Sequence, residues 1–87
     1  MEGQTFKIFT VKDELTGKFL QPVFIETEAE AIRWFKFVLN KTELWKDNAA
    51  MYSLYMVGKF NDIKGIEEQK PELIQGGLSV LERSENA

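Results

Sequence analysis

The chain has 87 residues, of which 44% are hydrophobic and 13% aromatic, and its formal net charge at neutral pH is -3. This length predicts a single domain over residues 1–87, close to the size at which one hydrophobic core gives only marginal stability. Because cysteine and histidine are both absent, thiolate metal sites are excluded and the commonest general base is missing, so we expect neither an enzyme nor a cofactor or metal site.

The first predicted elements form a hairpin. Residues 6–12 are rich in β-branched and aromatic side chains and predict a strand. Residues 13–18 have turn composition, with a glycine suited to positive φ, and a second strand is expected over residues 19–26. Pro22 has no amide hydrogen to donate, so the second strand should lie at a sheet edge or be bulged there.

The strongest pattern is helical and covers residues 27–39. Thr27 and Glu30 fit a capping box, in which the Thr27 hydroxyl accepts from the Glu30 amide while the Glu30 carboxylate reaches back to the Thr27 amide. Asn40 is a permissible end of the helix, and Phe37 falls outside the apolar face. At about 100° per residue, that apolar face consists of Ala31, Ile32, Phe35, Val38 and Leu39.

A second pair of strands is expected after the helix. Residues 41–50 predict a loop with one helical turn, anchored by Trp45. Residues 51–60 predict a long central strand. After a turn, residues 66–69 predict a short, polar strand at an edge. The side chains expected on one side of the long strand are Tyr52, Leu54, Met56 and Phe60.

Less order is predicted toward the C-terminus. Pro71 is expected to break regular structure, and the glycine pair 76–77 is expected to be flexible. Residues 78–81 form an apolar segment, so the ordered core should extend over about residues 5–81. The polar tail, residues 82–87, is expected to be flexible.

The order strand, strand, helix, strand, strand predicts the α+β class, with a small antiparallel sheet of two hairpins and one helix packed on one face. Phe6 and Ile8 point to one side of the first strand and Phe9 and Val11 to the other, so both faces of the sheet should be apolar. We expect a second subunit, in a homodimer, or the C-terminal segment to cover the other face. A stacking platform for bases is the alternative.

One stretch departs from the overall acidity. Between Arg33 and Lys46 lie four basic residues and one acidic residue, Glu43, a local net charge of +3 in a chain of net charge -3. Cations interleaved with aromatic rings suit the phosphates and bases of single-stranded nucleic acid, although an ordinary helix with solubilising lysines is the alternative interpretation. The candidate nucleic-acid-binding residues are Arg33, Lys36, Phe37, Lys41, Trp45 and Lys46.

Residues 6–13, 21–33 and 52–62 resemble corresponding stretches of the small nonstructural protein of microviruses, single-stranded DNA phages of the gokushovirus kind; this protein is often labelled a DNA-binding or ORF5-type protein. The most distinctive feature is a proline-aromatic strand that runs into the capped helix, combined with the later Tyr-x-Leu-x-x-x-Gly-x-Phe-x-Asp hairpin. This chain lacks the His-Pro pair that is usual before Tyr52.

The resemblance implies a non-virion protein of the infected bacterial cytoplasm, with a role in genome replication or its switch to packaging. We expect weak, non-specific binding of single-stranded DNA. The alternative is an interaction module that binds a phage or host replication protein without contacting DNA, which the acidic residues Asp62, Glu67 and Glu68 favour. Neither a membrane segment nor a signal peptide is expected, and no small-molecule substrate is evident.

Overall fold

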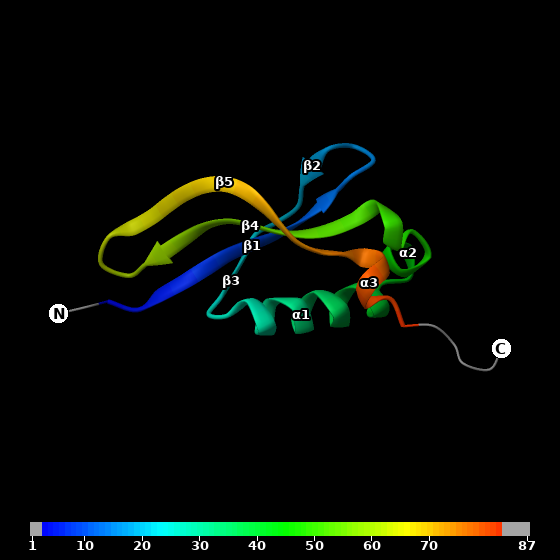
Figure 1. Cartoon of the computed structure of the whole chain (residues 1–87), viewed down its shortest axis with the longest axis horizontal. Coiled ribbons are helices and arrows are strands. Elements are labelled where there is room, and N and C mark those ends of the chain that lie inside the picture. The colour runs from blue at the N-terminus through cyan, green and yellow to red at the C-terminus, as the bar shows by residue number, and fades with distance from the viewer. Residues whose placement is uncertain (1–2, 83–87) are drawn as a thin grey trace.

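The computed structural model describes residues 3–82 and consists of one curled antiparallel sheet with helices on one side (Figure 1). This architecture confirms the predicted α+β class. Within residues 3–82, none of the helices is long and apolar enough to cross a membrane. Of the tail predicted to be flexible, residues 83–87 lie outside the described range. In chain order, the elements are β1 (Thr5–Asp13), β2 (Lys18–Phe19), β3 (Val23–Ile25), α1 (Glu28–Lys41), α2 (Glu43–Asp47), η1 (Ala49–Met51), β4 (Tyr52–Asn61), β5 (Gly65–Gly76) and α3 (Gly77–Val80).

The sheet has the order β2-β1-β4-β5, and β3 also pairs with β1. The predicted second strand is therefore present as two short pieces at one edge, separated by residues 20–22. Pro22 cannot donate to a strand ladder, which explains the gap and confirms the expected edge position. The Thr10 hydroxyl donates to the Leu20 carbonyl oxygen at 2.8 Å and so ties the interrupted edge to β1.

The prediction that regular structure ends before Pro71 is wrong. The outer strand β5 continues from Gly65 to Gly76. Its pairing with β4 is irregular around Pro71, because Met56 pairs with Glu72 while Gly58 pairs with Glu68. Pro71 thus lies in a bulge on an edge strand, where its missing amide hydrogen costs no ladder hydrogen bond.

A bulge at Val57 of β4 corrects the expectation that Phe60 lies on the same side of the long strand as Met56. Phe9 pairs with Met56, whereas the preceding residue Ile8 pairs with Gly58, so β4 has one extra residue at this point. Because side chains alternate along a strand, the extra residue moves Phe60 to the face opposite Met56. Phe60 therefore lies beside its partner Phe6 on the sheet face away from α1.

Helix α1 starts at the predicted cap. The Thr27 hydroxyl oxygen accepts from the Glu30 amide at 3.1 Å, and the same hydroxyl lies 3.1 Å from the Glu30 carboxylate. A hydroxyl can accept and donate at once, so the Glu30 carboxylate bonds to the Thr27 hydroxyl in place of the predicted backbone amide. The cap fixes the direction in which the helix leaves β3.

Asn40 is not the end of the helix, which continues to Lys41. Its side-chain amide donates to the Val80 carbonyl oxygen at 3.0 Å, and its side-chain oxygen accepts from the Glu82 amide at 2.7 Å. Asn40 therefore fastens the C-terminal segment to α1. Of the glycine pair 76–77, expected to be flexible, Gly77 is packed into this junction, since a Cβ on it would meet the Ala49 and Tyr52 carbonyl oxygens, whereas a Cβ on Gly76 would meet open space.

The core lies between α1 and the sheet. Phe35 and Leu39 of α1 are fully buried against Phe9 and Leu54 of the two central strands. Phe37 is 60% exposed. The predicted orientation of the helix is thus confirmed, with the largest completely buried side chains being Phe9, Phe35, Leu39, Leu54 and Val11.

Candidate nucleic-acid interface

Three of the predicted residues form a row along the solvent side of α1. Arg33, Phe37 and Lys41 are spaced four residues apart, so they lie on neighbouring turns of the same side of the helix. The Lys41 ammonium lies 5.0 Å from the centroid of the Phe37 ring, within the range of a cation–π interaction. We call these three residues the outer stripe. It presents an exposed aromatic ring together with cations.

Lys36 is also exposed on α1, but it has an acidic neighbour. Its ammonium lies 3.6 Å from the Glu82 carboxylate. Both side chains are more than half exposed, and ion pairs of this kind contribute little to stability. The positive charge of Lys36 is therefore partly compensated in the free protein, although a competing phosphate could displace Glu82 at low cost.

Trp45 and Lys46 lie apart from the outer stripe, on α2. The Trp45 ring stacks on the Tyr52 ring with a centroid separation of 4.9 Å and an interplanar angle of 18°. Together with Trp34, it lines an apolar hollow beside the interrupted sheet edge. One face of the indole is thus already occupied, which fits the predicted anchoring role of Trp45 in the loop.

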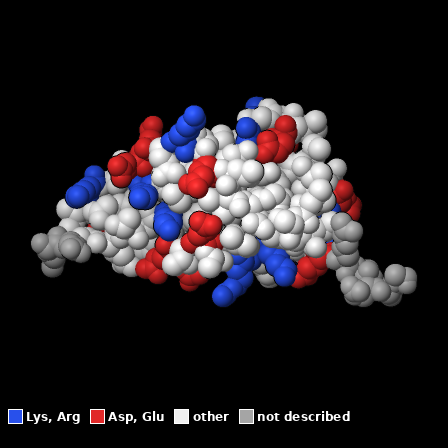
Figure 2. All heavy atoms as spheres, in the orientation of Figure 1, with Lys and Arg blue, Asp and Glu red and all other residues white. Residues whose placement is uncertain are grey.

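Charges of both signs are interspersed on one face of the molecule (Figure 2). Figure 2 shows acidic and basic side chains interspersed on the visible face, with basic groups projecting at the lower edge, where Figure 1 places α1. The cations of α1 are therefore a local feature, and the visible face has no continuous basic surface.

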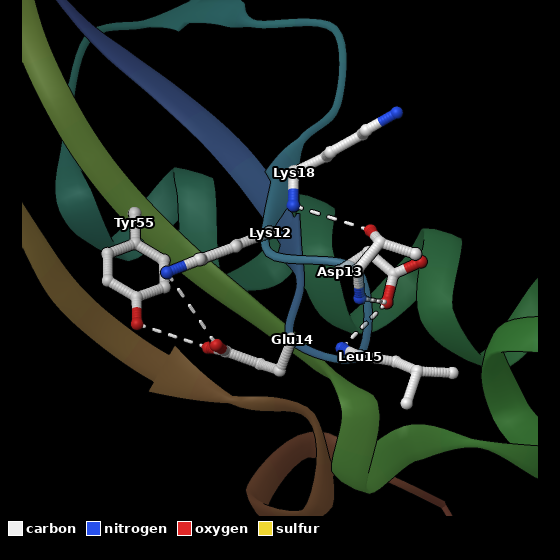
Figure 3. A network of polar contacts seen from close by, with 7 residues as sticks. Lys12, Asp13, Glu14, Leu15, Lys18 and Tyr55 are labelled. Atoms are coloured by element: carbon white, nitrogen blue, oxygen red, sulfur yellow. Dashed lines mark hydrogen bonds and ion pairs between the residues drawn. The ribbon is translucent and has the colours of Figure 1, made fainter.

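The sequence interpretation missed a polar cluster on the opposite side of the sheet (Figure 3). The Tyr55 hydroxyl donates to the Glu14 carboxylate at 3.1 Å, and the Lys12 ammonium lies 3.9 Å from the same carboxylate. Lys12 also lies 5.4 Å from the Phe19 ring centroid and 5.5 Å from that of Tyr55. Burial first, and then the hydrogen bond to Glu14, raise the pKa of Tyr55 above its ordinary value of 10.0.

This cluster depends on strand register. Lys12 pairs with Phe19 across one ladder, and Thr10 pairs with Tyr55 across the other. Lys12, Glu14 and Phe19 belong to the first hairpin, but Tyr55 becomes their neighbour only through the pairing of β1 with β4. No local motif in the sequence could have placed Tyr55 in the cluster.

Within residues 3–82, the sheet surface away from α1, which we call the far face, includes two apolar hollows. One is lined by Phe6, Phe24, Phe60 and Ile66, and the other by Thr10, Phe19, Leu20, Pro22, Val57 and Pro71. The C-terminal segment does not cover this surface within the described residues, because Val80 is part of the core on the α1 side. The expectation that the C-terminal segment covers the far face is therefore wrong for residues 77–82.

A comparison with protein-family models finds a match over residues 6–80 to the model described as Phage ORF5 protein. The matched range begins in β1 and ends at the last residue of α3, and so includes the outer stripe and the far face. No curated protein and no solved structure matches the chain.

Proposed function

The chain belongs to the phage ORF5 protein family, and from this premise we propose that it binds single-stranded DNA weakly and without sequence preference. The proposed role is in replication of a phage genome or its switch to packaging, in the cytoplasm of the infected bacterium. The resemblance of residues 6–13, 21–33 and 52–62 to the microvirus nonstructural protein supports a phage with a single-stranded DNA genome.

The exposed ring of Phe37 is the observation that carries this proposal. A phenylalanine with 60% of its surface in water contributes little to the core of a small domain. Its face can stack on a base, and stacking is tolerant of sequence because every base has a π-face. Lys41 beside the ring and Arg33 one turn earlier supply cations for the adjoining phosphates.

The charges limit the strength of this binding. If Arg33, Lys41 and one of the two remaining lysines each neutralise a phosphate, the slope of log affinity against log salt should be about -2 for a single strand. The net charge of -3 opposes long-range attraction of DNA. We therefore expect measurable binding only at low ionic strength.

A salt series of fluorescence anisotropy with a labelled single-stranded oligonucleotide tests this function. The double variant Arg33→Ala/Lys41→Ala should flatten the slope by about 1.4 and weaken binding equally for different base sequences. Phe37→Ala should weaken binding by about 1 to 3 kcal/mol and leave the slope unchanged. A control with the same loss of charge, Lys59→Ala/Lys64→Ala near the β4–β5 turn, should retain the wild-type slope.

Absence of binding at low salt, or equal effects of the two double variants, would count against this site. The better account would then be binding of a phage or host replication protein. Glu67, Glu68 and Glu72 are exposed along the edge strand β5 and favour that second function. Recovery of a replication protein with the chain after nuclease treatment would support it.

A further inference from the structure

We propose that the far face is the interface of a homodimer, in which two copies pack sheet against sheet. This inference does not depend on DNA binding. It starts from the bulge at Val57, which directs Phe60 away from α1. Phe60 then meets Phe24 edge to face, with ring centroids 5.6 Å apart. At the other end of the far face, Phe19 and Tyr55 form a second edge-to-face pair at 5.6 Å.

The apolar area of the far face is large for a chain of this size. The exposed fractions are 49% for Phe24, 42% for Phe19, 36% for Leu20, 63% for Ile66 and 57% for Leu73. With roughly 150–250 Å² for each aromatic side chain, and taking the same range for leucine and isoleucine, these five expose roughly 370–620 Å². If two copies buried these side chains completely, the area from these residues alone would be roughly 740–1,240 Å², a range that includes the lower bound of about 1,000 Å² for a specific interface.

The charges on the far face favour a protein partner over nucleic acid. Lys12 is paired with Glu14 at 3.9 Å, so this cation is already compensated within the chain. Glu68, which pairs with Gly58, adds a carboxylate to the same side of β5. Among the described residues, this surface therefore has no net positive charge to offer to phosphates. Because Lys12 and Glu14 are already paired and partly shielded from water, covering them leaves neither charge uncompensated, whereas a new lone carboxylate would be.

The sheet edges are poorly suited to self-association. The outer strand β5 carries four charged side chains and Pro71, features that hinder pairing with another strand. The opposite edge is interrupted at residues 20–22. The open face remains, and a two-fold dimer uses the same patch on both copies. Two identical sheets have the same twist, so they can pack face to face at the usual angle of about 30°.

In this arrangement α1 lies on the outside of each copy. The outer stripe stays exposed, so substitutions on the far face and on α1 can be interpreted separately. A DNA site on each copy would remain accessible whether or not the dimer forms.

Light scattering during size-exclusion chromatography tests the dimer. Wild type should have a mass of about twice the 10.1 kDa of one chain. Phe24→Glu and, at the other end of the far face, Leu73→Glu should each weaken association by about tenfold or more, because a carboxylate would be buried at the interface. Leu44→Glu on α2, where the leucine is 63% exposed, is the control and should remain dimeric.

Circular dichroism would show that both far-face variants retain the fold. A wild-type mass of 10.1 kDa at high concentration would overturn the proposal, as would a dimer that tolerates both far-face substitutions. If the wild type is monomeric and Phe24→Glu abolishes its DNA binding, the far face is instead a platform for stacking bases.

Discussion

Replacing Phe35 with alanine should remove a large part of the stability of the domain. Phe35 is 0% exposed and packs within a cluster that includes Phe9, Leu39 and Leu54. Truncation of a buried phenylalanine costs about 3–5 kcal/mol, from lost burial and from the cavity that remains. At about 0.05–0.15 kcal/mol per residue, a chain of 87 residues has a total stability of only about 4–13 kcal/mol.

Phe37→Ala is the matched control, since it makes the same chemical change two residues along the same helix. Phe37 is 60% exposed, and alanine is a better helix former by about 0.5 kcal/mol. The free energy of unfolding should therefore change by less than about 1 kcal/mol. The same variant removes the proposed stacking surface, so it separates stability from DNA binding.

Urea melts followed by circular dichroism measure both variants, at one protein concentration because dimerisation would contribute to stability. With a slope of about 1–2 kcal/mol per M, Phe35→Ala should lower the midpoint by about 1.5–5 M. Phe37→Ala should leave it nearly unchanged. Equal losses for the two variants would refute the orientation of α1 on the sheet.

Three further predictions concern the C-terminal junction and the polar cluster. Gly77→Ala should destabilise the domain by about 1–3 kcal/mol in thermal or urea melts, because the added Cβ would meet the Ala49 carbonyl oxygen; an unchanged midpoint would contradict this packing. Asn40→Ala should speed hydrogen exchange in residues 77–82 relative to the core, since it removes the hydrogen bond to Val80. An equal change in the exchange rates of residues 77–82 and of the core would contradict this role of Asn40. For Tyr55, whose folded-state pKa is raised, the neutral phenol stabilises the fold below pH 10.0, and this contribution is lost as the pH rises through the folded pKa. Wild type should thus lose stability relative to Tyr55→Phe at high pH, and parallel stability curves would show that the shift is absent.

Local signals in the sequence are enough to predict α1. The capping residue Thr27 and the spacing of apolar residues act within one or two helical turns, and both are present in the structure. The spacing of four residues that places Arg33, Phe37 and Lys41 on one side of the helix is equally local. These parts of the candidate site could therefore be found without coordinates.

The course of β5 could not be predicted in this way. Pro71 locally favours a break, and only the pairing with β4 allows a bulge to accommodate it. The change of face at Phe60 likewise depends on one extra residue in a ladder between distant strands. The same holds for Lys36, whose acidic neighbour Glu82 comes close only because the C-terminal segment returns to α1.

The most direct test of the proposed function is an NMR titration of the ¹⁵N-labelled chain with a short single-stranded oligonucleotide at low salt. Binding through the outer stripe predicts chemical shift changes centred on Arg33, Phe37 and Lys41, with the amides of the far face around Phe24 and Phe60 unchanged. Changes centred on the far face, or none at all at low salt, would contradict the assignment of DNA binding to α1.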